Sequence, residues 1–403
     1  MSAFVFSKRL AIVMTFFILI STLLFHGCNG SDDDEMGTVF VESNPDGASV
    51  FIDGNYQSEQ TPATFELEPG EYTVSASMPG YIPTPESVIV DLASGGDENV
   101  LFEFEEDTSA GYIMVTTNPS GATIFLDDAR FRHLTPYSVP ASPGEHEVRV
   151  ELSGFEPMTE VVTVTSGSTT NLDFGRLNSK KIILIEDFTN VYCPNCPDAT
   201  ENVMDAVESG YQDDVIVLEF HPSSGPFYDR DVFYQYNPEE NNHRFADYYG
   251  FSGVPQVVLD GDVLTNVSED GGMQIVADAI DIAMTETPNV SIWGNWNDSR
   301  QANFTIESDV ALDGEIFGFV YRREIHFDEE PGNNGLTDFH NVVYDFFPDD
   351  SENDITLTPG EEQEFSFEFE ICDSLLNEEQ ISLSIIVQGD DKHVYQAVNL
   401  IKQ

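Results

Sequence analysis

Residues 181–199 read KIILIEDFTNVYCPNCPDA, and this stretch determines the fold of the segment around it. Its apolar start, Lys181–Glu186, predicts a strand that is buried on both faces. Two cysteines follow where that strand turns into a predicted helix ending near Ser209. Backbone N–H groups at a helix start stabilise a thiolate, and a second thiol one turn along the helix can resolve a mixed disulfide. The pattern predicts a redox pair in which Cys193 is the nucleophile and Cys196 is the resolving thiol.

The segments that follow alternate between strands and helices. The predicted elements are a buried strand at 215–220, a helix at 238–249, a strand at 253–260, a short partner strand near Val263 and a helix at 270–286. Together with the first strand and helix, this order is that of the thioredoxin fold. We therefore predict a thioredoxin-like α/β domain over residues 180–287.

Two further features resemble thioredoxins and imply roles for particular residues. Asp187, six residues before Cys193, matches the buried acid that thioredoxins place behind the active site. This implies that Asp187 takes the proton of Cys196, whereas an acid exposed at a strand end is the alternative interpretation. Val254-Pro255 matches the loop whose cis-proline faces the disulfide and whose preceding residue pairs with the substrate backbone.

A more specific resemblance extends to the end of the chain. The matching stretches are LIEDFT (184–189), CPNCPDA (193–199), FHNVV (339–343) and the closing segment 385–397. They are similar to Bacteroidetes outer-membrane lipoproteins of the outer-membrane-protein-28 family. The resemblance covers residues 180–403 and implies a thioredoxin-like half followed by a β-sandwich half. Short predicted strands separated by Gly and Pro turns agree with an all-β sandwich over 288–403.

The preceding part of the chain contains an internal duplication. Residues 44–48 (NPDGA) recur as residues 118–122 (NPSGA), and other motifs recur at the same offset. Alternating strands and Gly, Pro and Asp turns predict a small antiparallel β-sandwich in each copy. The copies resemble the PEGA domain over 38–106 and 111–175, which implies spacer or envelope-binding modules without chemistry of their own.

The N-terminus is typical of an exported lipoprotein. Lys8 and Arg9 precede an apolar run that ends at Gly27-Cys28. This resembles a bacterial lipobox and implies a signal peptide over 1–27, a lipid on Cys28 and an acidic tether over 28–37. The acidic tether resembles the export signal of Bacteroidetes surface lipoproteins, so we expect an outer-membrane or cell-surface location. A short uncleaved membrane anchor is the alternative.

The composition excludes several classes of partner. The chain has 73 Asp plus Glu against 15 Lys plus Arg, a formal net charge of −58. No basic stripe is present to bind nucleic acid, and the folded body is unsuited to anionic lipid. Salt screens such self-repulsion, so we interpret the acidity as a sign of a saline, halophilic habitat. An ordinary acidic secreted protein is the alternative.

The cysteines leave more than one function open. A Cys-x-x-Cys pair can hold zinc, but a structural zinc site needs four ligands, so we expect no metal and no cofactor. Carboxylates nearby on the predicted helix, among them Asp198, oppose a strongly depressed thiolate pKa. Cys372 has no predicted partner and is expected to be a buried, unreactive thiol; an intermolecular bridge is the alternative.

The sequence thus predicts two small antiparallel β-sandwich repeats, a thioredoxin-like α/β domain and a C-terminal all-β sandwich. Its leading functional hypothesis is thiol–disulfide exchange with envelope or surface proteins that carry thiols or disulfides. The second hypothesis is a non-catalytic surface binding or scaffold lipoprotein in which Cys193 and Cys196 form a structural disulfide.

Overall fold

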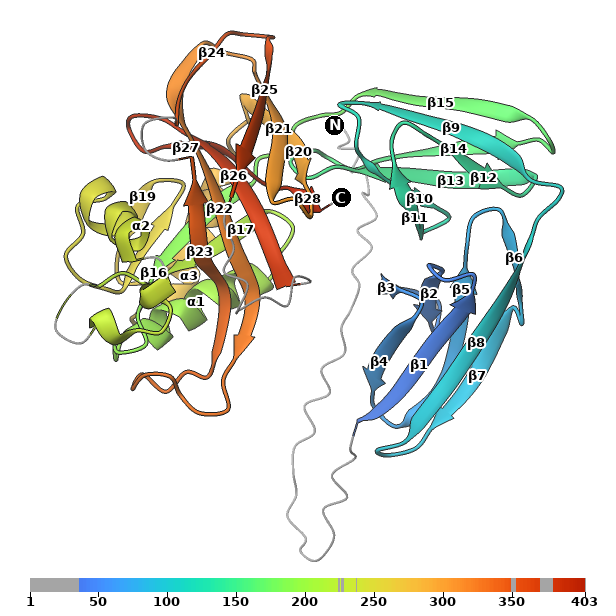
Figure 1. The fold of residues 1–403 in the computed structure, drawn as a ribbon, viewed down its shortest axis with the longest axis horizontal. Helices are drawn as coiled ribbons and strands as arrows, with labels where there is room; N and C mark the ends of the chain where they lie inside the picture. Colours follow the sequence, from blue (N-terminus) through green and yellow to red (C-terminus); the bar gives the residue numbers. More distant parts are fainter. Residues whose placement is uncertain are drawn as a thin grey trace, which may run out of the picture.

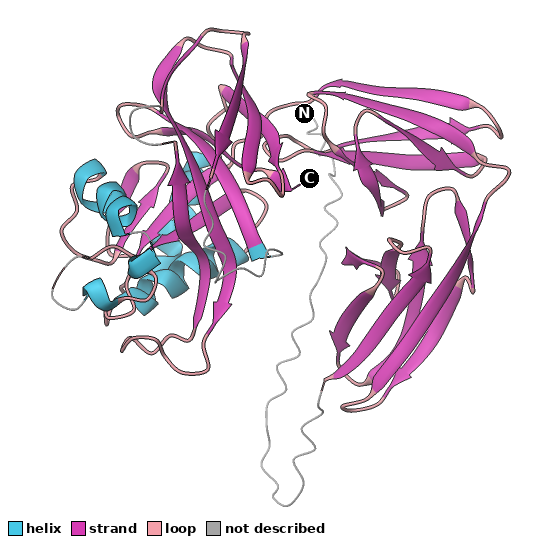
Figure 2. Cartoon of the chain, in the orientation of Figure 1, coloured by secondary structure: helices cyan, strands magenta, loops and turns pink. Residues whose placement is uncertain are grey.

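The computed structural model describes residues 36–223, 225, 228–236, 238–348, 353–369 and 380–402. The predicted signal peptide, Cys28, all of the predicted tether before residue 36, and Cys372 lie outside the described residues. Figures 1 and 2 show a smaller β-rich body followed by a larger body that holds the helices. No helix in the described ranges is long and apolar enough to cross a membrane.

The first repeat consists of two facing sheets. Its strands are Gly37–Asn44 (β1), Ser49–Ile52 (β2), Asn55–Gln60 (β3), Ala63–Leu67 (β4), Gly70–Ser77 (β5), Tyr81–Thr84 (β6), Ser87–Leu92 (β7) and Asp97–Glu106 (β8). The sheet orders are β4-β1-β8-β6 and β3-β2-β5-β7. Alternate residues such as Val39 and Val41 point between the sheets and build the core, as the period of a strand requires.

The second repeat has nearly the same arrangement. Its strands are Gly111–Asn118 (β9), Thr123–Leu126 (β10), Ala129–Leu134 (β11), Tyr137–Ala141 (β12), Gly144–Glu151 (β13), Met158–Val164 (β14) and Thr169–Arg176 (β15). They form the sheets β12-β9-β15 and β11-β10-β13-β14. The predicted antiparallel pairing is confirmed, except that the first and last strands of each repeat, β1 with β8 and β9 with β15, pair in parallel.

The α/β part has the predicted topology. Its strands are Ile183–Phe188 (β16), Val215–Phe220 (β17), Gln256–Leu259 (β18) and Asp262–Leu264 (β19). Its helical segments are Cys196–Glu208 (α1), Tyr228–Arg230 (η1), Tyr234–Tyr236 (η2), Pro238–Asn242 (α2), the π-helical turn His243–Tyr248 (η3) and Gly272–Ala283 (α3). The order is β19-β18-β16-β17, with β16 and β17 parallel and β18 antiparallel to β16. This is the strand arrangement of the thioredoxin fold.

The two faces of this sheet are covered by different elements. Helices α1 and α3 pack on the face that carries Ile183 and Ile185. The opposite face carries Leu184 and Phe188 and is covered by aromatic side chains from η3 and the residues after it, among them Phe245. A strand between two covered faces must be apolar on both, which explains the continuous apolar run in the sequence.

The C-terminal part is a sandwich of two sheets. Its strands are Val290–Trp296 (β20), Gln301–Ser308 (β21), Leu312–His326 (β22), Asp338–Phe347 (β23), Asp354–Leu357 (β24), Glu362–Glu368 (β25), Ile381–Gln388 (β26), Val394–Asn399 (β27) and Ile401–Lys402 (β28). One sheet has the order β25-β21-β20-β28. It packs on β22, β26 and their neighbours through a buried cluster that includes Ile292, Phe304 and Leu383.

The α/β part and the sandwich share one sheet. Among the described residues, β17 lies beside β23 through the parallel pair Glu219 and Val342. The result is a nine-stranded sheet that starts at β19, crosses β16 and β17, and ends at β27, with β24 at the side of β22. The sheet therefore takes strands from both sides of the predicted boundary at residues 287 and 288.

The second repeat contacts the C-terminal sandwich directly. The Phe155 ring meets the Trp293 ring on β20 at 6.2 Å between centroids. Arg176 at the end of β15 forms an ion pair with Glu307 on β21 at 2.9 Å. A Cβ at Gly154, where φ is +80°, would lie 2.7 Å from a methyl group of Val398. This close approach requires glycine.

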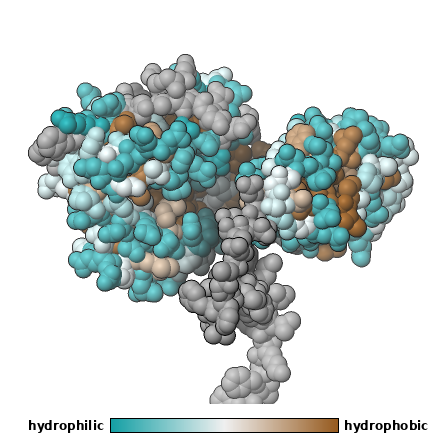
Figure 3. All heavy atoms as spheres, turned by 90° about the horizontal axis from the view of Figure 1, so that it is seen from below, coloured by the Kyte–Doolittle hydropathy of each residue, from teal (hydrophilic) through white to brown (hydrophobic). Residues whose placement is uncertain are grey.

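The surface differs between the two bodies. Figure 3 shows the larger body as mostly hydrophilic on the face in view, while hydrophobic atoms gather on the smaller body. The exposed apolar side chains of the first repeat include Ile82 on β6, Ile89 on β7 and Leu101 on β8, which are 54%, 68% and 50% exposed.

Candidate functional site

The two cysteines of the motif form a disulfide at the start of α1. Cys196 is the first residue of the helix, so it does not lie one turn along the helix as predicted. Cys193 precedes the helix and is 2% exposed, and Cys196 is fully buried. The unpaired N–H groups of the first helical turn therefore lie beside the pair, and the side chain of Asn195 does not cap them.

Asp187 is buried on β16, on the face covered by α1. The Thr200 hydroxyl, one turn beyond Cys196, donates a 2.6 Å hydrogen bond to Asp187 Oδ2. The other oxygen, Oδ1, has no hydrogen-bond partner among the described residues. Burial, together with the negative charge of Glu219 on the neighbouring strand, raises the pKa of Asp187 to about 7. A buried carboxyl whose pKa lies near neutrality is suited to proton transfer.

The predicted loop has a cis peptide bond between Val254 and Pro255. Pro255 directly precedes β18, whose first residue pairs with Phe188 at the end of β16. Pro255 and Ala199 of α1 line the same small cavity of about 210 Å³. Val254 packs against the core on the other face of the sheet. The loop and the first turns of α1 therefore lie side by side.

A buried ionic triad that the sequence analysis did not anticipate lies at the end of β17. His221 Nε2 is 2.7 Å from Glu219 Oε1, and His221 Nδ1 is 2.9 Å from Asp231 Oδ2. All three side chains are at most 4% exposed. Burial alone lowers the pKa of His221, but the two carboxylates outweigh it and raise this pKa to about 10. At neutral pH the imidazole is therefore a cation between two acids.

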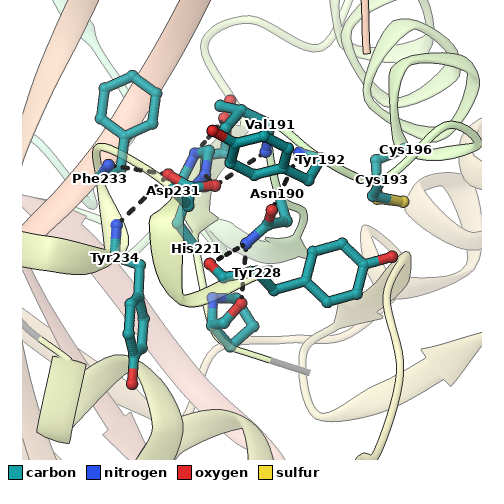
Figure 4. Close-up of polar contacts among 12 residues, drawn as sticks. Asn190, Val191, Tyr192, Cys193, Cys196, His221, Tyr228, Asp231, Phe233 and Tyr234 are labelled. Atoms are coloured by element: carbon teal, nitrogen blue, oxygen red, sulfur yellow. Dashed lines mark hydrogen bonds and ion pairs between the residues drawn. A yellow bond between two sulfur atoms is a disulfide. The ribbon is translucent and has the colours of Figure 1, made fainter. Parts of the chain in front are cut away.

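Asp231 also fixes the chain just before the disulfide, as Figure 4 shows. Its Oδ2 accepts a 2.8 Å hydrogen bond from the Val191 backbone N–H, and its Oδ1 accepts one from the Phe233 N–H. The Asn190 amide donates to the Pro222 carbonyl at 3.1 Å. Residues 190 and 191 are thus held from several directions, and they position the turn that presents Cys193.

Sequence patterns contained one signal for this triad. Glu219 lies in an otherwise apolar buried strand, and a buried charge needs a partner. His221 has no partner at a metal-ligand spacing in the sequence, and Asp231 lies in a loop without regular periodicity. The described residues contain no group of three or more His, Cys, Asp or Glu side chains that could hold a metal ion.

Comparison with known proteins identifies the repeats. Residues 36–99 and 110–178 each match the PEGA domain family, at the positions where the duplication predicted PEGA domains. No curated protein matches the chain. One similar solved structure is HBP35 of Porphyromonas gingivalis, with 16% identity and a TM-score of 0.44 over 55% of this chain and 74% of that chain.

The two PEGA domains and the disulfide fit a protein of the cell envelope, because structural disulfides persist in oxidising compartments. Membership of residues 180–403 in the outer-membrane-protein-28 family stays a prediction, as does the lipid on Cys28.

Proposed function

We propose that this protein is a thioredoxin-like lipoprotein that exchanges disulfides with other envelope or surface proteins. In this proposal a lipid on Cys28 anchors it at the outer membrane or cell surface. The observation that supports exchange best is the Cys193–Cys196 disulfide at a helix start, with buried Asp187 bonded to the next turn of that helix.

The proposed reaction starts from the disulfide. A substrate thiolate attacks the Sγ of Cys193, the less buried of the two residues; the bond to the Cys196 sulfur breaks and a mixed disulfide forms. Cys196 leaves as a thiolate and takes the proton held by Asp187. A second substrate thiolate attacks the substrate sulfur of the mixed disulfide and releases Cys193. The substrate dithiol has then lost two electrons to the protein, and the reverse sequence reduces a substrate disulfide.

Each neighbouring group has a defined task in this reaction. The helix N–H groups stabilise a thiolate at Cys193. Asp187 exchanges a proton with Cys196. In this proposal the backbone of Val254, in the loop before β18, pairs with the substrate, and Pro255 lies against the sulfurs.

A second candidate function is a scaffold with a structural disulfide. The observation that favours it is burial: Cys193 is only 2% exposed, so an attacking thiolate must first displace part of the surrounding loop. Redox-active cysteines are usually more accessible. In this case the disulfide would only fix the start of α1.

An insulin-reduction assay distinguishes the two functions. The assay uses a background in which Cys28 and Cys372 are replaced by serine, so that only the motif can react. For an exchange protein we expect turnover well above background, loss of turnover on Cys193→Ser, and a trapped mixed disulfide on Cys196→Ser. Equal background rates in all three proteins, with the disulfide intact in the protein that keeps both motif cysteines, would support the scaffold and contradict the exchange proposal.

A further inference from the structure

The structure has a second candidate site, far from the cysteines in sequence. A cavity of about 590 Å³ lies between the second repeat and the outer face of the sheet β25-β21-β20-β28. The wall from the repeat includes Gly121, Leu134 and Leu152, and the floor is formed by the sheet. Ligand sites occur preferentially at such domain junctions, and pockets of about 300–1,000 Å³ hold drug-sized ligands.

The floor consists of two rows of side chains that cross three strands. The strand registers define one row as Trp293, Thr305 and Glu364, and the other as Asn295, Asn303 and Ser366. Residues paired across a sheet point to the same face with neighbouring Cβ atoms about 5 Å apart. An indole ring, two amides, two hydroxyls and one carboxylate are therefore collected on one patch.

Most of these polar groups have no hydrogen-bond partner among the described residues. The Ser366 hydroxyl donates a 2.9 Å hydrogen bond to Asn303 Oδ1. Within the described ranges, the side chains of Trp293, Asn295 and Glu364 have no hydrogen-bond partner. The patch therefore offers donors and acceptors to a ligand in the cavity.

The indole ring is held in place by the second repeat. Trp293 is half-buried, and its ring contacts Phe155 edge-on while packing against the core of that repeat. The second repeat thus fixes the aromatic part of the patch and closes one side of the cavity. Neither body alone forms this site.

The chemistry of the lining selects one ligand class. The described residues that line the cavity include no Lys or Arg, so the lining does not favour phosphate or other anions, and Glu364 repels them. The hydrogen-bonding groups are unsuited to a purely apolar ligand. A sugar ring has an apolar face that fits an indole and a rim of hydroxyls that both donate and accept. We propose that this cavity binds a short neutral oligosaccharide, with Trp293 under a sugar ring and Asn295 and Glu364 on its hydroxyls.

The two tryptophans of the chain allow a direct test. Trp296 lies on the same strand but is only 5% exposed and packs into the sandwich core, so it does not face the cavity. In the full chain carrying Trp296→Phe, Trp293 is the single fluorescent reporter. The probes are cellohexaose, xylohexaose, mannohexaose and N-acetylchitohexaose, with oligogalacturonate as the acidic control and a neutral Ser/Thr-rich peptide as the protein-like control.

We expect at least one neutral sugar to change the Trp293 fluorescence with a Kd of about 1 μM to 1 mM, confirmed by calorimetry. Trp293→Ala and Asn295→Ala should each weaken binding, the former by about tenfold or more. The affinity should be nearly the same at low and at molar salt, since no ion pair is involved. Trp293→Ala also loosens the contact with Phe155 of the second repeat. Glu364→Gln lies on the exposed side of the sheet, so its effect on binding is independent of that contact.

Three results would overturn the proposal. They are no binding of any neutral sugar at millimolar concentration, binding of the peptide in place of the sugars, and sugar binding that Trp293→Ala and Asn295→Ala both leave unchanged. None of these results depends on the cysteines, so the exchange reaction and the sugar site can fail separately.

Discussion

Glu186 and Asp187 are neighbours on β16, yet their side chains face opposite sides of the sheet. Glu186 meets a cation, because Arg244 Nε donates a 2.7 Å hydrogen bond to its Oε1. Asp187 forms no ion pair among the described residues: its hydrogen bond comes from the Thr200 hydroxyl, the acid Glu219 raises its pKa, and the charge of His221 lowers that pKa less strongly. Because of its surroundings, the same carboxyl group is an ion-pair partner on one face and, in the proposed exchange, a proton carrier on the other.

The pKa of Asp187 gives a prediction about exchange. In the reduction of insulin, ionised Asp187 accepts the proton of Cys196, so the rate should rise with pH through about 7. Burial is the larger cause of the raised pKa; Glu219→Gln removes the second cause and should move the rise to lower pH, by roughly one unit. Thr200→Val removes the hydrogen bond that lowers this pKa and should move the rise to higher pH.

The measurement is the single-turnover rate of pre-reduced protein with insulin between pH 5 and 9. Asp187→Asn is the control, because it should lose this rise and retain any contribution from the Cys193 thiol. Shifts of the same sign for Glu219→Gln and Thr200→Val would contradict the assignment.

At the scale of elements, η3 connects the two halves of the larger body. Arg244 of η3 is fully buried and bonds both Glu186 on β16 and Gln388 on β26, the latter at 2.9 Å. Its guanidinium lies 4.5 Å from the Tyr248 ring centroid and 4.6 Å from that of Phe317. The π-helical turn, β16 and the far side of the shared sheet are therefore fixed by one side chain.

Removing one partner of this pair should be costly. We expect Glu186→Gln to lower the free energy of unfolding by about 3–5 kcal/mol, because it leaves the Arg244 charge buried without its counter-ion. The double variant Glu186→Met with Arg244→Met should lose less, since no unpaired charge remains. The check is urea denaturation followed by tryptophan fluorescence.

An exposed ion pair is the matched control for this experiment. The Asp298 and Lys402 side chains are 81% and 37% exposed, so Asp298→Asn should change the stability by at most about 1 kcal/mol. Equal losses for the single and the double variant would show that packing, rather than charge, determines the cost.

The elements also show which parts of the structure sequence patterns can predict. Asp187, Cys193 and Cys196 lie within ten residues, so local spacing and the apolar run predict the strand that carries Asp187, the helix, and the turn between them that carries Cys193. The sequence did not predict the triad of Glu219, His221 and Asp231, because Asp231 lies in a loop. The contact of β17 with β23 escaped because its residues, Glu219 and Val342, are far apart in the chain and pair at a single position.

At the scale of the molecule, the dominant property is the net charge of −58. Several of the few cations form internal ion pairs: Arg244 inside the larger body, Lys181 with Asp260 at 2.9 Å, and Arg176 between the second repeat and the sandwich. Cations placed in this way join parts of the fold. The remaining surface carries a large excess of acids that repel one another.

Salt should therefore stabilise the fold. We expect the urea midpoint, followed by the fluorescence of Trp293 and Trp296, to rise as NaCl increases from 0.1 to 1 M, because the Debye length falls from about 10 Å to about 3 Å. Choline chloride at equal ionic strength is the control for specific sodium binding. A midpoint that does not change with either salt would contradict the interpretation of the acidity as an adaptation to saline surroundings.

The parallel pairing of the first and last strands in each repeat has a mechanical consequence. The chain enters the first repeat at the start of β1 and leaves it at the end of β8, and these two strands run side by side in parallel over residues 38–44 and 97–103. A pull on the two ends of the repeat acts along the strands in opposite directions. This force acts on all hydrogen bonds between the two strands at once, in shear. In a hairpin pulled at its ends, the hydrogen bonds would instead break one after another. The second repeat has the same arrangement with β9 and β15. Both repeats therefore resist a stretching force applied along the chain.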